Sequence, residues 1–373
     1  MSSDILIIAG EPSGEDHGLT FLPELKSKLS DRKFYGVGGD RFKSLGVELL
    51  YHTTEFSGIG ISEVLAKIPF YYKAMRRIEE EVKRRGTQYA ILIDFQTFNL
   101  KLAKRLKAQG VDVFYYVAPQ AWVWKAWRAK IIEECVHTLF TILPFEKEWF
   151  EQRGVSKVIS VPHPLWVKYE SQLQILPIPE YRVEGKKRLL LLPGSRSAEL
   201  KNLIPIYNET LKLLKNQYQL DLELGLVGIE RLKPYYQQFC QELKYFDSEQ
   251  LSEALQWADI TLAASGTVSL ACGLFLKPTV VCYKLSKVTE WVVGLFLTYK
   301  GPVSLTNIIL KKMVFPELTQ DNAKASSLAQ ELNRLAISRS DYDNCVKELR
   351  KLHELMQGES FSVAQYLYKA IKG

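Results

Sequence analysis

Short apolar segments alternate along this chain with longer segments in which apolar residues recur at helical spacing. No other pattern in the sequence restricts the fold as strongly, because this alternation is typical of a parallel β-sheet covered by helices. In the first half of the chain, it predicts strands at residues 5–9, 34–37, 89–93, 113–117 and 138–143, and helices at 18–29, 71–85, 98–108 and 145–153. These elements predict one doubly wound α/β domain.

Prolines interrupt the alternation at residues 161–188, and this segment is predicted to be an irregular linker between two domains. The pattern then resumes, with predicted strands at 189–192, 221–226, 260–263 and 279–283 and predicted helices at 200–216, 234–242, 248–256 and 267–275. Residues 322–372 are expected to be wholly helical. The length of 373 residues also favours two domains. We expect them at residues 1–164 and 165–349, with a C-terminal helix at 350–373 that packs back on the first.

Composition excludes several classes of protein. Hydrophobic residues make up 47% of the chain and charged residues 24%, which excludes a disordered or fibrous protein. The net charge of +7 suits a polyanionic ligand or an anionic membrane surface, although a solvated basic face is the simpler interpretation. The sequence holds no nucleic-acid-binding motif, so no nucleic acid partner is expected. The five cysteines form no C-x-x-C pair, which argues against a disulfide framework and a zinc site. We expect neither a metal nor a cofactor.

Membrane contact is expected to be peripheral. The N-terminal segment lacks the features of a signal peptide, and the longest apolar stretch, residues 291–297, is far shorter than the roughly 20 residues of a spanning helix. A candidate membrane-facing segment has apolar residues at roughly helical spacing beside lysines and arginines. It contains Ile61, Val64, Leu65, Ile68 and Tyr72. Packing of this segment against the domain core explains the spacing equally well.

Polar residues follow the predicted strands of the first half, where open parallel sheets bind ligands. Glu11, Ser13 and Gly14 lie in a turn that leads into a helix N-terminus, which favours anions, although a purely structural turn is as good an interpretation. Asp94 follows the strand at 89–93 and is a candidate to take a proton from an attacking hydroxyl group, with helix capping as the alternative.

Two further residues of the first half are candidates for ligand contact. Asn99 and the aromatic residues beside it suit a sugar-shaped ligand. His163, between two prolines at the predicted domain junction, is a candidate either for ligand contact or for a hinge.

The second half contains two glycine turns between a strand and a helix. Gly194, Ser195 and Arg196 offer backbone donors and a guanidinium group to a diphosphate. Ser265, Gly266 and Thr267 form a second turn with small polar donors. Either turn alone is weak support, and both together predict a nucleotide site. Asp341-Tyr342-Asp343 has a metal-like spacing, but we interpret it as a helix cap.

Ten short segments, in a fixed order over nearly the whole chain, resemble the motifs of a known family. They are Gly10-Glu11-Pro12-Ser13-Gly14, Gly36-Val37-Gly38-Gly39, Gly60-Ile61-Ser62-Glu63-Val64-Leu65, Ile93-Asp94, Phe98-Asn99, Tyr116-Val117-Ala118-Pro119-Gln120-Ala121-Trp122, Leu143-Pro144-Phe145-Glu146, Leu192-Pro193-Gly194-Ser195-Arg196, Ala264-Ser265-Gly266-Thr267 and Val303-Ser304-Leu305-Thr306-Asn307. The family that they resemble is that of the lipid A disaccharide synthases.

The resemblance implies the GT-B glycosyltransferase fold, which has two Rossmann-like domains with parallel sheets facing a cleft. It implies an inverting enzyme of lipid A and lipopolysaccharide synthesis, peripheral on the cytoplasmic face of the inner membrane. Such an enzyme joins UDP-2,3-diacylglucosamine to 2,3-diacylglucosamine 1-phosphate through a β-1′,6 linkage and releases UDP.

The resemblance also implies roles for individual residues. Asp94 matches the proposed general base, and Arg196 with the two glycine turns would hold the diphosphate without metal. Asn307 matches a site asparagine, and the segment that begins at Ile61 matches the region thought to contact membrane and acyl chains.

The chain departs from the family pattern at three positions. It has Glu15 where aspartate is usual, Thr306 where proline is usual, and Ala271 where a glutamate commonly grips the ribose of the nucleotide. Loss of that contact would cost about 1–3 kcal/mol, a ten- to hundredfold weaker donor complex. A noncatalytic or weakened paralogue that binds UDP-sugar or acylated glucosamine is therefore the alternative function, followed by a UDP-sugar epimerase. A homodimer stays an open alternative.

Overall fold

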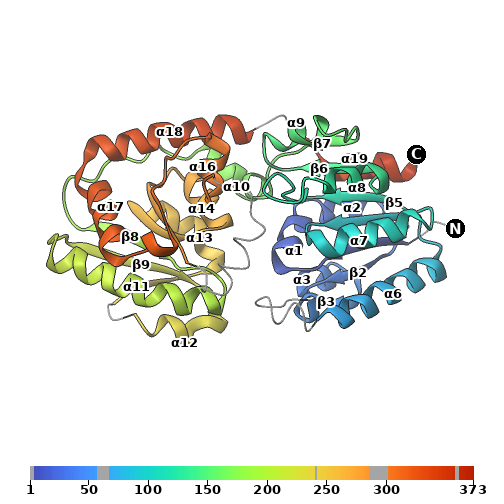
Figure 1. The fold of residues 1–373 in the computed structure, drawn as a ribbon, viewed down its shortest axis with the longest axis horizontal. Coiled ribbons are helices and arrows are strands. Elements are labelled where there is room, and N and C mark those ends of the chain that lie inside the picture. Colours follow the sequence, from blue (N-terminus) through green and yellow to red (C-terminus); the bar gives the residue numbers. More distant parts are fainter. Residues whose placement is uncertain (1–3, 57–66, 240–241, 285–300, 358–360) are drawn as a thin grey trace. The chain divides into compact units, whose positions relative to one another are not determined.

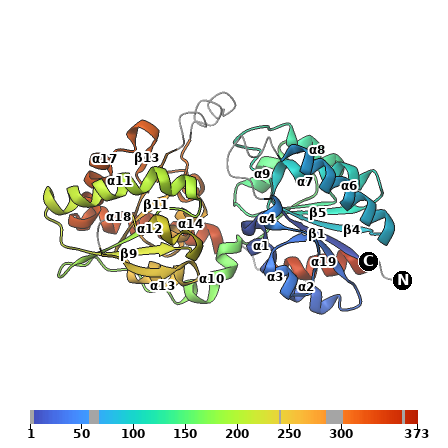
Figure 2. The ribbon, with the colours of Figure 1, turned by 90° about the horizontal axis from the view of Figure 1, so that it is seen from below.

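The computed structural model describes residues 4–56, 67–239, 242–284, 301–357 and 361–373. The chain divides into two compact α/β units (Figures 1 and 2). The described residues of the first unit are 4–56, 67–168 and 361–373, and those of the second are 169–239, 242–284 and 301–357.

The described residues of the first unit form a seven-stranded parallel sheet with the order β3-β2-β1-β4-β5-β6-β7. Its strands are β1 (Ile5–Ala9), β2 (Phe34–Gly38), β3 (Glu48–His52), β4 (Tyr89–Ile93), β5 (Asp112–Tyr116), β6 (Thr138–Thr141) and β7 (Val158–Ser160). In the central register, Ile5 of β1 lies opposite Phe34 of β2 and Tyr89 of β4. Because the helices cover both faces of the sheet, its inner strands are almost continuously apolar.

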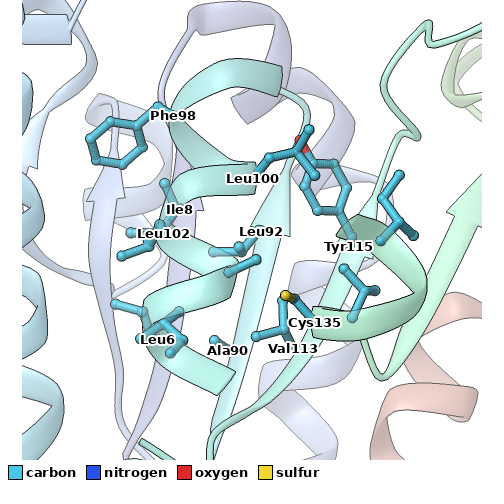
Figure 3. Packing of buried hydrophobic residues seen from close by; sticks show 14 of the residues in the cluster. Leu6, Ile8, Ala90, Leu92, Phe98, Leu100, Leu102, Val113, Tyr115 and Cys135 are labelled. Atoms are coloured by element: carbon cyan, nitrogen blue, oxygen red, sulfur yellow. The ribbon is translucent and has the colours of Figure 1, made fainter. Parts of the chain in front are cut away.

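Helices lie on both faces of this sheet. They are α1 (Pro12–Leu19), α2 (Leu22–Lys28), α3 (Asp40–Ser44), α4 (Thr53–Phe56), α6 (Ile68–Arg85), α7 (Gln96–Lys107), α8 (Arg128–Cys135), α9 (Glu146–Glu151) and α19 (Val363–Lys372). Leu6 and Ile8 point to the face covered by α6, α7 and α8, where they pack with Leu102 and Leu92 (Figure 3). Ile5 and Ile7 point to the other face, because side chains alternate along a strand.

The second unit repeats this architecture. Its described residues form a six-stranded parallel sheet with the order β10-β9-β8-β11-β12-β13. The strands are β8 (Lys187–Leu192), β9 (Leu222–Gly228), β10 (Lys244–Asp247), β11 (Ile260–Ala264), β12 (Thr279–Tyr283) and β13 (Glu317–Thr319). The helices are α11 (Ser197–Asn216), α12 (Lys233–Tyr236), α13 (Leu251–Trp257), α14 (Thr267–Leu274), α16 (Leu305–Leu310), α17 (Ala325–Ile337) and α18 (Arg339–Gln357), with short 3₁₀ turns at Glu230–Leu232, Ser248–Gln250 and Gln320–Asn322.

The predicted α/β fold with two parallel sheets is confirmed. Both ends of every predicted strand lie within two residues of the ends of an observed strand. The predicted linker is wrong over part of its length, because α10 (Pro164–Gln174) lies within residues 161–188. Pro164 is the first residue of that helix, where a missing N–H group breaks no hydrogen bond. The predicted helix 18–29 is two helices, since α1 ends at Leu19 and α2 begins at Leu22.

Candidate active site

The backbone at the carboxyl ends of β4 and β5 adopts an unusual conformation. Asp94 and Phe95, directly after β4, have φ angles of 46° and 47°, and Val117, directly after β5, has a φ of 66°. Positive φ is unfavourable for residues with a Cβ atom, especially β-branched ones, and such conformations cluster at functional sites. The strained turn singles out Asp94 as a candidate functional residue.

Hydrogen bonds hold the Asp94 backbone in place. Its N–H group donates to the Tyr116 carbonyl at 2.9 Å. Its own carbonyl accepts from the Tyr115 hydroxyl at 2.7 Å and from Nδ2 of Asn99 at 2.8 Å. Asn99 is fully buried and also donates to the Ile93 carbonyl at 3.1 Å. The predicted cleft residue Asn99 therefore braces the turn from inside.

The electrostatic environment of Asp94 suits a general base near neutral pH. Burial, followed by the nearby negative charge of Glu11, raises the pKa of the Asp94 carboxyl to about 6. A catalytic base is most efficient when its pKa lies close to the working pH. Asp94 is still partly accessible, in contrast to Asn99.

The turn after β1 approaches the Asp94 turn closely. A Cβ atom at Gly10 would lie 2.5 Å from the ring of Phe95, so only glycine fits there. Glu11 precedes α1 and is half-buried, Ser13 is exposed, and Gly14 packs beneath them near the carbonyl of Ile93. These three predicted residues thus lie at the carboxyl ends of the strands, as Asp94 does.

Glu15 and His163 are buried in the first unit. Glu15 accepts hydrogen bonds from the N–H groups of Gly39 and Phe42, both at 2.8 Å, which fixes the start of α3. His163 is 3% exposed, and its Nδ1 accepts from the Leu165 N–H group at 3.0 Å. Burial lowers the pKa of His163 to about 3, so the ring is neutral at physiological pH.

Two buried residues near this edge were not among the predicted site residues. Glu146, 1% exposed, accepts from Trp122 Nε1 at 3.1 Å and from the Leu143 N–H group at 3.2 Å, and burial raises its pKa to about 7. Arg128 is the first residue of α8 and is 2% exposed. Glu146 ends the motif Leu143-Pro144-Phe145-Glu146 after β6, and Arg128 lies between β5 and β6, but the sequence does not show that their side chains are buried.

In the second unit, the turn after β8 carries the first predicted donor site. Gly194 has a φ of 103°, a backbone conformation that residues with a Cβ atom rarely adopt, so this turn favours glycine. Ser195 and Arg196 are exposed, and Arg196 precedes the first turn of α11, where backbone N–H groups are free to bind an anion. Its guanidinium group pairs with Glu199 at 3.2 Å.

The turn after β11 carries the second predicted donor site. Gly266 has a φ of 146° and precedes α14, which begins at Thr267. The Ser265 hydroxyl donates to the Val303 carbonyl at 3.2 Å, which joins this turn to the segment before α16. Ala271 is buried in α14, at 1% exposure.

Asn307 is also fully buried, and its polar atoms are used inside the unit. Its Nδ2 donates to the Phe315 carbonyl at 2.8 Å and to Oε1 of Glu317 at 2.7 Å, while its Oδ1 accepts from the Phe315 N–H group at 2.9 Å. Glu317 in turn accepts from the N–H groups of Val303 and Ser304 at 2.7 and 2.9 Å. Asn307 and Glu317 therefore fix the segment that contacts Ser265.

The predicted membrane-facing residues divide into two groups. Ile61, Val64 and Leu65 lie outside the described residues. Ile68 and Tyr72 are on α6 and are 42% and 48% exposed. Within the part of the chain that the structure describes, no helix has the length and apolar character needed to cross a membrane. The same residues contain no group of three or more metal-ligating side chains that could hold an ion.

Two doubly wound units with polar turns at their strand ends place the chain in the fold class of GT-B glycosyltransferases and UDP-N-acetylglucosamine 2-epimerases. Spinosyn rhamnosyltransferase complexed with thymidine diphosphate has this fold, with a TM-score of 0.60, 8% identity, and coverage of 99% of this chain and 100% of its own. So has the UDP-N-acetylglucosamine 2-epimerase of Neisseria meningitidis, with a TM-score of 0.51, 10% identity, and coverage of 95% and 99%.

Sequence comparison identifies the family within this class. The profile of the Lipid-A-disaccharide synthetase family matches residues 5–371. The lipid-A-disaccharide synthase of Myxococcus xanthus is 33% identical, over 93% of this chain and 92% of its own length. That of Nitrosococcus oceani is 31% identical, over 99% and 96%. The chain belongs to the lipid-A-disaccharide synthetase family, as its motifs predict, and has this family's glycosyltransferase activity on lipid A precursors.

Proposed function

We propose that this glycosyltransferase joins UDP-2,3-diacylglucosamine to 2,3-diacylglucosamine 1-phosphate, forms a β-1′,6 linkage and releases UDP. Membership of the family supports lipid A precursors as the substrates. The observation that carries the proposal is Asp94, a partly accessible carboxylate with a raised pKa on a strained turn at a parallel sheet edge.

Asp94 is the proposed general base. Its carboxylate takes the proton of the acceptor 6-hydroxyl group as that oxygen attacks the anomeric carbon of the donor. The new C–O bond forms on the face opposite UDP, the bond between the anomeric carbon and the diphosphate oxygen breaks, and the configuration inverts. Asn99 and Tyr115 keep the turn of Asp94 in place during this step.

The two glycine turns of the second unit are the proposed donor site. The backbone N–H groups near Gly194 and Ser195 and the guanidinium group of Arg196 neutralise the charge that grows on the diphosphate as it leaves. The turn of Ser265, Gly266 and Thr267 contacts the nucleotide from the neighbouring strand. Asn307 acts indirectly, because its side chain holds the segment to which the Ser265 hydroxyl donates a hydrogen bond.

Both substrates carry acyl chains, and we propose that the enzyme works on the cytoplasmic face of the inner membrane as a peripheral protein. The described part of α6 supports this, because Ile68 and Tyr72 are exposed beside the exposed cations Lys73, Arg76 and Arg77. Such a face suits an anionic membrane surface.

A coupled assay with radiolabelled acceptor tests the proposal. The native protein should release UDP and form disaccharide only when both acylated sugars are present. Asp94→Asn should lower kcat by about 10²–10⁴-fold, the usual effect of losing a general base, while UDP binding is unchanged. Asp112→Asn is the control, because Asp112 begins β5 at the opposite end of the sheet from Asp94.

Two outcomes would contradict the proposal. Substantial turnover by Asp94→Asn would reject the base assignment. Tight UDP binding by the native protein without product over a long incubation would favour a noncatalytic paralogue, the function suggested by Ala271. An Ala271→Glu variant assayed in parallel shows whether the missing carboxylate limits donor binding.

A further inference from the structure

Arg128 is a buried cation for which the described residues provide no acidic partner. Its guanidinium group donates from Nη1 to Oε1 of Gln96 and from Nη2 to the Thr97 hydroxyl at 3.2 Å. Its Nε is buried and has no hydrogen-bond acceptor within the described structure. Buried charges are normally paired, because removing them from water is costly. Two neutral oxygens therefore leave the charge of Arg128 uncompensated.

A second cation lies beside Arg128. Nζ of Lys125 is 4.0 Å from the centre of the Trp124 ring, and the guanidinium carbon of Arg128 is 5.2 Å from the same centre. Burial and then the charge of Arg128 lower the pKa of Lys125, so the two positive charges repel each other. Arg128 also begins α8, whose first turn has no acidic residue and whose helix dipole adds positive potential there.

This cationic pair is linked to the turn of the proposed base through intermediate residues. Gln96 and Thr97, which accept from Arg128, follow the Asp94 turn directly at the start of α7. The hydroxyl of Tyr115 donates to the Asp94 carbonyl, and the pKa of Tyr115 responds to both Asp94 and Arg128. An anion bound by Arg128 and Lys125 would therefore lie beside the end of the sheet where the acceptor must present its hydroxyl group.

We propose that Arg128 and Lys125 form the site that binds the phosphate monoester of the acceptor sugar. The inference rests on the proposed function, in which the acceptor carries a 1-phosphate. A phosphate would accept from the unsatisfied Nε–H group of Arg128, pair with Lys125, and remove the repulsion between the two cations. Trp124 would form the wall that holds both cations in place. The site would thus select a sugar 1-phosphate as acceptor.

Acceptors with and without the phosphate test this inference. Arg128→Gln should raise the KM for 2,3-diacylglucosamine 1-phosphate about 10- to 100-fold, the effect of losing a charge-assisted contact. It should leave the KM for the UDP-sugar and the rate with 2,3-diacylglucosamine unchanged. Lys125→Gln should have a smaller effect in the same direction. Lys130→Gln is the matched control, because Lys130 is an exposed lysine on the same helix.

A binding measurement separates this inference from the proposed function. Calorimetric titration with glucosamine 1-phosphate and with glucosamine should show binding of the phosphorylated sugar by the native protein, weaker binding by Arg128→Gln, and full binding by Lys130→Gln. A native protein that makes no disaccharide but shows this pattern would contradict the proposed function only. If Arg128→Gln does not fold, Lys125→Gln and Arg128→Lys carry the comparison.

Two results would overturn the inference. The first is an equal loss of rate by Arg128→Gln with the phosphorylated and the unphosphorylated acceptor, which would make Arg128 a brace for the start of α7. The second is binding of glucosamine 1-phosphate by Arg128→Gln and Lys125→Gln with native affinity.

Discussion

Asp94 shows how one residue combines backbone strain and burial. Three residues with a Cβ atom at positive φ follow two neighbouring strands, namely Asp94, Phe95 and Val117. Each costs about 1–3 kcal/mol and persists only where the surrounding contacts fix it. Here Asn99, Tyr115 and the Tyr116 carbonyl fix it. The result is a carboxylate that is held at the sheet edge and is less solvated than an ordinary surface aspartate.

The raised pKa of Asp94 predicts the pH dependence of the reaction. A general base must be ionised, so kcat/KM should fall as the pH drops through about 6, the raised pKa of Asp94. Glu11→Gln removes a like charge, which favours the ionised form, so its acid limb should move to lower pH. Rate profiles of the native protein and the variant between pH 4 and about pH 9 measure the shift.

The control for this comparison is Asp16→Asn. Asp16 is on α1 near Glu11, but it is exposed and pairs with Arg41 at 2.5 Å. Its removal should leave the acid limb in place. An acid limb that stays at the same pH in Glu11→Gln, or one that moves upward, would show that Glu11 does not set the pKa of the base.

Among the secondary-structure elements, the inner strands of both sheets were predicted from the sequence and the outermost strands were not. Among the described residues, the strands that were not predicted are β3, β7, β10 and β13, and each is the outermost strand of its sheet. Interior strands are apolar on both faces and stand out as continuous hydrophobic runs, whereas edge strands are short and partly exposed. Their sequences therefore resemble those of loops.

The same limit applies to the candidate site. Polar residues at strand ends could be found from the sequence, because the alternation shows where each strand ends. The sequence does not show whether a polar side chain points outward or inward, because this depends on packing between elements. Asn99 and Asn307 were expected to contact ligands and are buried, whereas Arg128 and Glu146 are buried polar residues that the predicted set did not include.

The exposed apolar residues of α6 form a candidate membrane-binding surface that can be tested. Its Ala74, Met75 and Ile78 are buried in the core, whereas Ile68 and Tyr72 are exposed. Replacing both exposed residues with serine removes the apolar contact and leaves the core intact, so binding to vesicles that contain anionic lipid should fall severalfold. Cosedimentation measures the bound fraction, and rising salt should weaken what remains.

A charge change on the same helix is the control for the membrane experiment. Glu80→Ser alters an exposed residue of α6 without removing apolar surface, so it should not weaken binding. Native vesicle binding by the double variant would show that α6 does not contact the membrane through Ile68 and Tyr72.

The described residues of the two units form separate apolar clusters, one on each face of the first sheet and another in the second unit. The last helix, α19, packs on α2, and its Val363, Leu367 and Ile371 join the core that lies on one face of the first sheet. The first unit therefore needs the C-terminal end of the chain, although the second unit is built mainly from the residues between. Cores that are separate in this way favour unfolding in more than one step.

Calorimetry should resolve two transitions that respond to different changes. Leu367→Ala empties a fully buried site in the first core and should cost about 2–5 kcal/mol, which lowers the Tm of one transition. UDP should raise the Tm of the other, because a ligand at 100 times its Kd stabilises the unit that binds it by about 2.7 kcal/mol. Lys369→Ala, on the exposed side of α19, is the control for Leu367→Ala and should leave the Tm unchanged. Arg196→Gln is the control for UDP, because loss of this proposed donor contact should reduce the rise in Tm.

Which of the two transitions responds to Leu367→Ala and which to UDP shows which unit binds the nucleotide. If Leu367→Ala and UDP act on different transitions, the nucleotide binds to the unit that carries Gly194 and Arg196, as the donor-site proposal requires. A single transition that responds to both changes would show that the two units unfold together. A rise caused by UDP in the transition that Leu367→Ala lowers would move the nucleotide to the unit of Asp94, and the assigned roles of the two units would be wrong.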